Sequence, residues 1–245
     1  MTGRPSSWFA KWGFLTALIG AAACAFAGWG TRAELWSFGA GLRVLRLAAV
    51  GALFGSALSL IGLIATRGGK KRGRFSAILG VVLGLAAAGL PAAQDMKART
   101  LPAIHDITTD LENPPAFSAV VPLRRGAPNG VEYEGASVAD QQRRAYPDIQ
   151  PLSLVVPANQ AFDRALEAAR EMGWTIVDAN PAHGRIEATA TTFWFGFKDD
   201  VVVRVSATDS GSRIDVRSLS RVGRSDIGAN ARRIRCYLDK LSAVG

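Results

Sequence analysis

The first hundred residues contain three long hydrophobic runs without a charged side chain. The runs cover residues 13–30, 47–65 and 75–93, and each is 18 or 19 residues long. An α-helix needs about 20 residues to cross the hydrocarbon core of a bilayer. Three buried helices of a soluble protein, the alternative, would need a large partner domain to cover them. The pattern therefore predicts a membrane domain over residues 1–95 with three transmembrane helices.

Small residues recur at four-residue spacing within two of these runs. Gly51, Gly55 and Ser59 lie in the second run, and Gly80 and Gly84 lie in the third. This spacing lets helix backbones approach closely in lipid. The runs contain no Asp, Glu, Lys or His, and a proton or ion path requires such groups. We therefore expect structural spans and no transporter.

Beyond residue 150 the pattern changes to short segments in which apolar and polar residues alternate. Apolar residues at helical spacing predict a helix that ends at Gly173 and a final helix with an apolar stripe from Ile227 to Leu241. The alternating segments predict strands over residues 152–156, 174–180, 185–192, 201–207 and 213–220. Strict alternation is typical of an antiparallel sheet with one wet face and one covered face.

The order of these segments is strand, helix, four strands, helix. It predicts an α+β domain over residues 151–245, with an antiparallel sheet and helices on one face. A TATA-binding-protein-like topology is our first expectation, and a helix-grip fold is the second. Residues 96–150 are rich in turn-formers, as in ENPPAF and GAPNG. We expect them to tether or wrap the domain irregularly and not to form its core.

Charge separates the two parts of the chain and predicts their orientation. The formal net charge is +9, yet residues 100–245 contain 17 Lys/Arg against 18 Asp/Glu. A nearly neutral domain argues against a nucleic-acid partner. Seven basic residues lie at the N-terminus and in the loop RGGKKRGR, against five on the other side of the membrane. Cytoplasmic loops carry the excess of Lys/Arg, so we expect a multi-pass inner-membrane protein with a periplasmic C-terminal domain.

The N-terminus has a second interpretation. Arg4 and Lys11, the first hydrophobic run and the Ala25-Phe26-Ala27 triplet also fit a secretory signal with an Ala-x-Ala cleavage site. The run is long for such a signal. Cleavage would leave two spans and would not change the side on which the C-terminal domain lies.

Four sequence blocks carry a resemblance to a known family. They are IHDITTDLENPPAF, AYPDIQPL, IEATATTFWFGFKDDVVVRV and RSLSRVGRSDIGANARRIR. In this order, within about residues 100–242, they resemble the family catalogued as domain of unknown function 1499. The resemblance implies a bacterial or plastid envelope setting and no established activity.

Candidate catalytic residues are few. His105, Asp106 and Asp110 combine imidazole and carboxylates, which serve as metal ligands or as an acid and a base. Their spacing fits neither one helix face nor one strand face, and turn and cap chemistry explains the carboxylates equally well. Cys24 lies in the first span and Cys236 on the final helix, so they cannot pair within one chain. We expect no metal and no cofactor.

The stretch SRVGRSDIGAN before the final helix is a candidate anion site. Ser225 or Asp226 can cap the helix, and the free N–H groups of its first turn point back toward Arg221 and Arg224. A helix N-terminus beside arginines favours phosphate or carboxylate. Arg217, on the preceding strand, completes the candidate ligand-binding set.

The same arginines have a structural alternative. Asp226 would already supply the negative charge at the helix N-terminus. Arg217, Arg221 and Arg224 would then pair with Asp215 and neighbouring carboxylates. Sequence alone leaves both interpretations open.

The motif FWFGF places four aromatic residues around Gly196 at a strand end. In one interpretation they cap the core of the sheet. In the other, Trp194 and its neighbours contact the bilayer surface or close an apolar ligand cleft.

Two function classes remain after these observations. The sparse catalytic inventory and the adjoining spans favour a non-catalytic, membrane-anchored domain that binds an envelope lipid, an anionic ligand or a partner protein. The alternative is a hydrolase-like envelope enzyme that uses His105 with Asp106 or Asp110.

Overall fold

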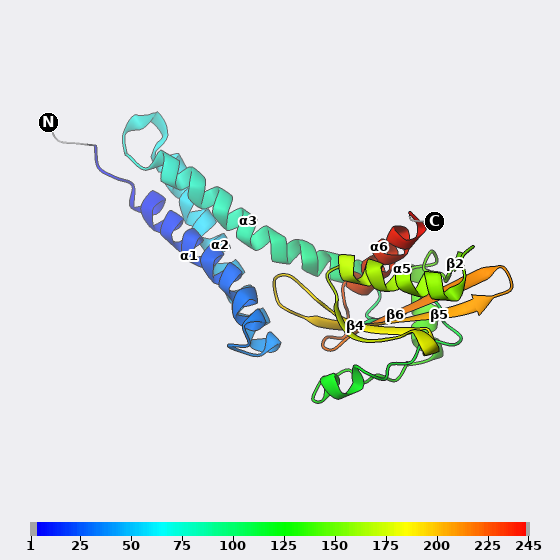
Figure 1. Cartoon of the computed structure of the whole chain (residues 1–245). Helices are drawn as coiled ribbons and strands as arrows, with labels where there is room; N and C mark the ends of the chain where they lie inside the picture. Colours follow the sequence, from blue (N-terminus) through cyan, green and yellow to red (C-terminus); the bar gives the residue numbers. More distant parts are fainter. Residues whose placement is uncertain (1–3, 244–245) are drawn as a thin grey trace. The chain divides into compact units, whose positions relative to one another are not determined.

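The computed structural model describes residues 4–243, and the chain divides into two compact units. One comprises Met1–Lys97 with the short segment Phe193–Gly196, and the other comprises Ala98–Thr192 with Phe197–Gly245. Three long helices come first along the chain, and a sheet with shorter helices follows (Figure 1).

The three long helices are α1 (Trp8–Arg32), α2 (Phe38–Ala65) and α3 (Arg74–Thr100). The hydroxyl groups of Ser7 and Ser37 cap the first two by accepting hydrogen bonds from backbone N–H groups. All three are long and apolar enough to cross a membrane. The three predicted spans are confirmed as helices, as in a multi-pass membrane protein.

Small residues allow these helices to pack closely. A Cβ added to Gly55 would lie 2.3 Å from the backbone nitrogen of Ala17, and one added to Gly84 would lie 2.4 Å from the carbonyl oxygen of Ala52. The predicted close approach is therefore confirmed at Gly55 and Gly84. At Gly51 it is wrong, because none of the described atoms lies within 4 Å of an added Cβ.

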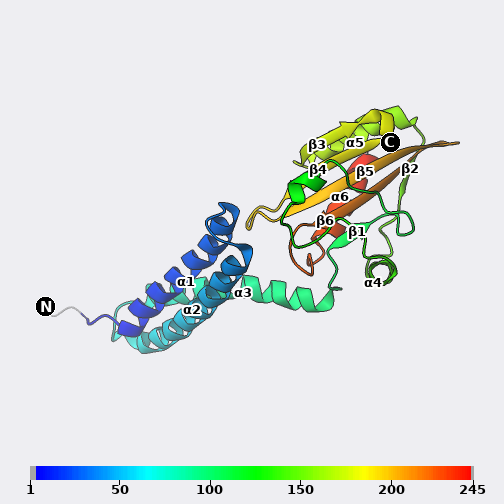
Figure 2. The same ribbon diagram turned by 90° about the horizontal axis from the view of Figure 1, so that it is seen from below.

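The second unit is built on an antiparallel sheet of six strands among the described residues. The strand order is β1-β6-β5-β4-β3, and β2 also pairs with β6 (Figure 2). The strands are β1 (Asp106–Thr108), β2 (Leu152–Leu154), β3 (Thr175–Asn180), β4 (Arg185–Thr191), β5 (Lys198–Thr208) and β6 (Gly211–Ser220). A short turn of helix, η3 (Pro181–His183), connects β3 to β4.

Two helices, α5 (Ala158–Glu171) and α6 (Ala229–Ser242), pack on one face of the sheet (Figure 1). Aliphatic side chains of the strands meet both helices in one buried core, which includes Ile186, Val203, Ile214, Phe162 and Ile234. Tyr237 of α6 is fully buried and donates its hydroxyl hydrogen to the carbonyl of Ala165 at 2.7 Å. The predicted α+β class and the order strand, helix, four strands, helix are confirmed.

The segment before β2 differs from the prediction. It contributes β1, which pairs with β6, and the helix α4 (Ala136–Ala145). Ile104 and Ile107 are buried in the core with α5 and α6, so the expectation that this segment stays out of the core is wrong. The Gln142 side chain of α4 accepts from Thr108 N–H at 3.0 Å and donates to Thr108 C=O at 2.6 Å. A strand of three residues such as β1 leaves no periodic signal in the sequence.

The other face of the sheet is covered as well. Residues 113–131, called the strap from here on, cross it and include the single helical turn η2 (Val121–Arg124). Phe117 and Val120 of the strap pack on Val202 and Leu219 of the sheet. Four polar side chains on this face are at most 3% exposed, namely Glu187, Asp200, Asp215 and Arg217. The predicted wet face is therefore wrong where the strap covers it, whereas Arg204 and Arg213, farther along the same face, are partly exposed.

Candidate functional site

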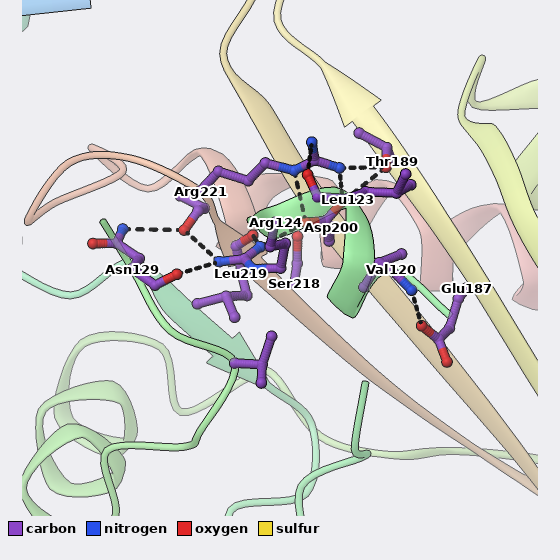
Figure 3. Close-up of polar contacts among 12 residues, drawn as sticks. Val120, Leu123, Arg124, Asn129, Glu187, Thr189, Asp200, Ser218, Leu219 and Arg221 are labelled. Carbon is purple, nitrogen blue, oxygen red and sulfur yellow. Dashed lines mark hydrogen bonds and ion pairs between the residues drawn. The ribbon is translucent and has the colours of Figure 1, made fainter. Parts of the chain in front are cut away.

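The polar contacts beneath the strap centre on Asp200, the third residue of β5 (Figure 3). Arg221 donates two hydrogen bonds of 2.8 and 2.9 Å to its carboxylate, and Arg124 donates one of 2.6 Å. Thr189 donates its hydroxyl hydrogen to the same carboxylate at 2.7 Å. Burial raises the pKa of Asp200, but the hydrogen bonds outweigh burial and hold the pKa below its ordinary 3.8. Asp200 is therefore an anion at neutral pH.

Arg124 joins η2 to the end of β6. Its guanidinium also donates to the carbonyl oxygens of Leu219, Asn129 and Ser220 at 3.1 to 3.3 Å. The side-chain amide of Asn129 donates in turn to the carbonyls of Ser220 and Gly223, at 3.0 and 2.9 Å. These contacts fix the strap to the loop between β6 and α6.

Glu187 of β4 holds the strap by its main chain. Its fully buried carboxylate accepts hydrogen bonds from the N–H groups of Ser118 and Val120 at 3.0 to 3.1 Å (Figure 3). Arg185 lies 3.1 Å from the same carboxylate and balances its charge. A side chain predicted to face water thus satisfies main-chain donors of the covering segment.

Arg217, predicted to bind a ligand, is engaged within the protein. It forms a buried ion pair with Asp106 of β1 at 2.7 Å and donates to the carbonyl of Val131 at 2.8 Å. Its guanidinium lies over the rings of Phe117 and Tyr133, 5.0 and 5.4 Å from their centroids. Burial raises the pKa of Asp106, and the hydrogen bonds from Arg217 oppose that rise. Through Phe117 and Val131, Arg217 therefore contacts the strap near both of its ends.

Asp110 and Asp215 form a second, partly exposed ion-pair group. Arg204 lies 2.9 Å from both carboxylates, and Arg213 lies 3.1 and 3.0 Å from them. Asp215 therefore pairs with these two arginines, and the predicted pairing of Asp215 with Arg217 is wrong. The prediction that neighbouring carboxylates pair with the arginines is confirmed at Arg217, which pairs with Asp106, and at Arg221, which pairs with Asp200, but not at Arg224.

The loop before α6 contains the remaining predicted residues. Gly228 is the N-cap residue of α6, so Asp226 does not occupy that position. Its carboxylate nevertheless accepts from the N–H groups of Gly228 and Asn230 at 2.8 and 2.7 Å and so satisfies donors at the start of the helix, as predicted. Burial raises the pKa of Asp226, and these backbone hydrogen bonds oppose the rise. The Ser225 hydroxyl accepts a local N–H bond within the loop. Arg224 is exposed, and no hydrogen bond or ion pair joins its side chain to another residue of the described chain.

The candidate catalytic residues do not form one acid-base set. The imidazole of His105 lies 3.7 Å from the carboxylate of Glu134. Asp106 is bound by Arg217, whereas Asp110 belongs to the separate ion-pair group described above. Within residues 4–243 no three His, Cys, Asp or Glu side chains group in a way that could hold a metal ion.

Trp194 lies in the loop between β4 and β5, within the segment that groups with the three long helices. Its role as a contact residue stays a prediction.

Two aspartates of β5 were missed in the sequence. Asp199 and Asp200 precede the strand predicted over residues 201–207, yet β5 begins at Lys198. Asp199 is nearly buried and pairs with Arg233 of α6 at 2.5 Å. The alternation along the strand could have revealed them, because a residue two positions before Val202 lies on the same face of the sheet as Val202, and that residue is Asp200.

Comparison with protein families agrees with the resemblance seen in the sequence. Residues 106–241 match the family described as Protein of unknown function (DUF1499). The match covers more than half of the chain and includes the strap, all six strands and most of α6. Comparison with curated proteins gave no match.

Proposed function

We propose that this chain, which belongs to the DUF1499 family of unknown function, is a non-catalytic, membrane-anchored binding domain of the bacterial envelope. Its ligand class would be an envelope lipid, another anionic ligand or a partner protein. Among these we favour an anion. The three long apolar helices support the membrane anchor.

The observation that carries this proposal is the contrast among the arginines near the end of β6. Carboxylates neutralise Arg217 and Arg221 at 2.7 and 2.8 Å. Arg224 lies in the loop next to them, is exposed, and has no ion-pair partner in the part of the chain that the structure describes. An incoming phosphate or carboxylate would therefore meet Arg224 without displacing an internal partner.

The hydrolase-like alternative would use His105 with Asp106 or Asp110, and neither carboxylate is free to assist it. A carboxylate that acts as a general base at neutral pH needs a pKa raised toward that pH. The pKa of Asp110 and of Asp200 is lowered below the ordinary value. Asp106 has a raised pKa but is enclosed by Arg217. These carboxylates are engaged in holding the fold.

Binding is tested on the full chain in a neutral detergent. Inorganic phosphate should raise the unfolding temperature of the unmodified protein, and Arg224→Gln should abolish the rise. Arg232→Gln, on the exposed side of α6, should retain it. An equal response from the two variants, or no stabilisation of the unmodified protein by phosphate, would contradict the proposal.

We also propose that the domain lies on the periplasmic side of the inner membrane. Five Lys/Arg in the loop of residues 67–74 support a cytoplasmic location for that loop. A reporter enzyme that is active only outside the cytoplasm should then work when fused after Thr100 and be silent when fused at Gly69. The reverse pattern would place the domain inside the cell.

A further inference from the structure

An exposed aliphatic surface lies on the outer side of the strap. Val121 and Leu123 of η2 are 40% and 52% exposed, and Pro122 between them is also exposed. The carbonyl of Leu123 accepts a hydrogen bond of 3.0 Å from Arg221, so this turn adjoins the loop that carries Arg224. We call Val121–Leu123 together with Arg125 and Arg224 the strap surface.

The charge of the strap surface is positive. Neither residues 113–131 nor residues 216–225 contain an Asp or Glu. Arg125 and Arg224 are exposed, and no hydrogen bond or ion pair joins either side chain to the rest of the described chain. Aliphatic side chains flanked by cations are the combination that favours a lipid-water interface with anionic headgroups.

Buried contacts hold this surface in place. Arg124 and Arg221 approach the buried carboxylate of Asp200 from η2 and from the β6–α6 loop (Figure 3). A surface fixed in this way loses little conformational entropy when it binds. The strap surface is therefore preformed.

We propose that the strap surface docks on the anionic surface of the bilayer in which the chain's own helices are inserted. This inference rests on the proposed function and names its ligand as a lipid surface. Only five residues separate α3 from β1, a span of roughly 18 Å at full extension. Such a short tether keeps the effective concentration of the domain at the bilayer high, so a few weak contacts suffice for docking.

The test uses the full chain in lipid nanodiscs. A fluorophore is attached at Gly130→Cys in a Cys24→Ala/Cys236→Ser background. Gly130 is exposed, and none of the described atoms lies within 4 Å of an added Cβ there. Discs with brominated phosphatidylglycerol should quench this label several-fold more than discs with brominated phosphatidylcholine alone.

Docking should depend on both parts of the surface. Arg125→Gln and Arg224→Gln should each lower the ratio of docked to free domain about fivefold. Leu123→Ser should lower it as well, and added salt should reduce the preference for phosphatidylglycerol. A label at Gln160→Cys, exposed on α5 on the opposite face of the sheet, is the control and should show no such preference.

The outcomes separate this inference from the proposed function. Equal quenching at the two label positions would overturn the inference, as would quenching that does not respond to Leu123→Ser and Arg224→Gln. If phosphate still stabilised the protein through Arg224 in that case, anion binding would stand without lipid docking. A loss of both responses would remove both proposals.

Discussion

Beneath α5 and α6 the sheet presents Ile186, Val203 and Ile214, each at most 1% exposed, whereas beneath the strap it presents Glu187 and Asp200, which are fully buried. The first face is held by aliphatic packing, and the second combines a small apolar cluster with hydrogen bonds to guanidinium and N–H groups. Alternation along a strand therefore distinguishes two faces without showing which of them meets water.

The two faces should respond differently to small changes in their side chains. Aliphatic burial is non-directional and scales with area, so losing one methyl group costs little. A buried ion pair needs its partner, because removing one member leaves an uncompensated charge.

The largest difference should come from two conservative substitutions, one on each face. Asp200→Asn removes the charge that Arg124 and Arg221 share and should lower the free energy of unfolding by about 3 to 5 kcal/mol. Ile214→Val on the other face should cost about 0.5 to 1.5 kcal/mol. Denaturant unfolding of the full chain in detergent measures both. Equal losses would mean that the two faces are held by the same chemistry.

A smaller, local effect should follow Arg217→Lys. Lysine lacks the several N–H donors with which the guanidinium binds both Asp106 and the Val131 carbonyl. The free energy of opening the strap should therefore fall by about 2 kcal/mol. Hydrogen exchange should then accelerate in residues 113–131. Exchange in α5 should stay unchanged, and Arg232→Lys is the control. Acceleration across the whole domain would show that the strap is not a separate unit.

The cap of α6 allows a comparison at a single position. Asp226→Ala should cost about 1 kcal/mol, because the N–H groups of Gly228 and Asn230 lose their acceptor. Asp226→Asn should cost much less, since asparagine caps equally well and avoids burying a charge. Thermal unfolding of the two variants tests this, and equal losses would show that the charge matters more than the acceptor.

The smallest effect at ordinary pH concerns titration of Asp200. Its folded-state pKa is lowered below 3.8, so its stabilising contribution is complete above that pH and is lost as the pH falls through the folded-state pKa. The stability gap between the unmodified protein and Asp200→Asn should therefore be constant near neutrality and shrink in acid. Ile214→Val should show no such trend. A gap that widens in acid would reverse the sign of the linkage.

Sequence patterns predicted the parts of the structure that depend on periodicity. Apolar length identified α1, α2 and α3, and the alternation of Ile186, Ala188 and Ala190 with polar residues identified β4 and its two faces. The strap has no periodicity, so nothing in its sequence indicated which surface it covers. Its fit depends on contacts such as Arg124 with Asp200, which lie 76 residues apart.

The candidate site shows the same limit. Asp106 was a candidate acid or base and Arg217 a candidate ligand-binding residue, yet they are partners across 111 residues of chain. Both residue types fit the chemistry assigned to them. Their pairing depends on β1 lying beside β6, which a three-residue strand does not reveal in sequence.

The contact between Gln142 and Thr108 has a consequence for neighbouring molecules. A strand at the border of a sheet offers its peptide groups to any passing strand, which makes such borders sites of aggregation. On β1 the side-chain amide of Gln142 already occupies both the N–H and the C=O of Thr108. When copies crowd within the plane of one membrane, these two backbone groups are closed to strand exchange between them.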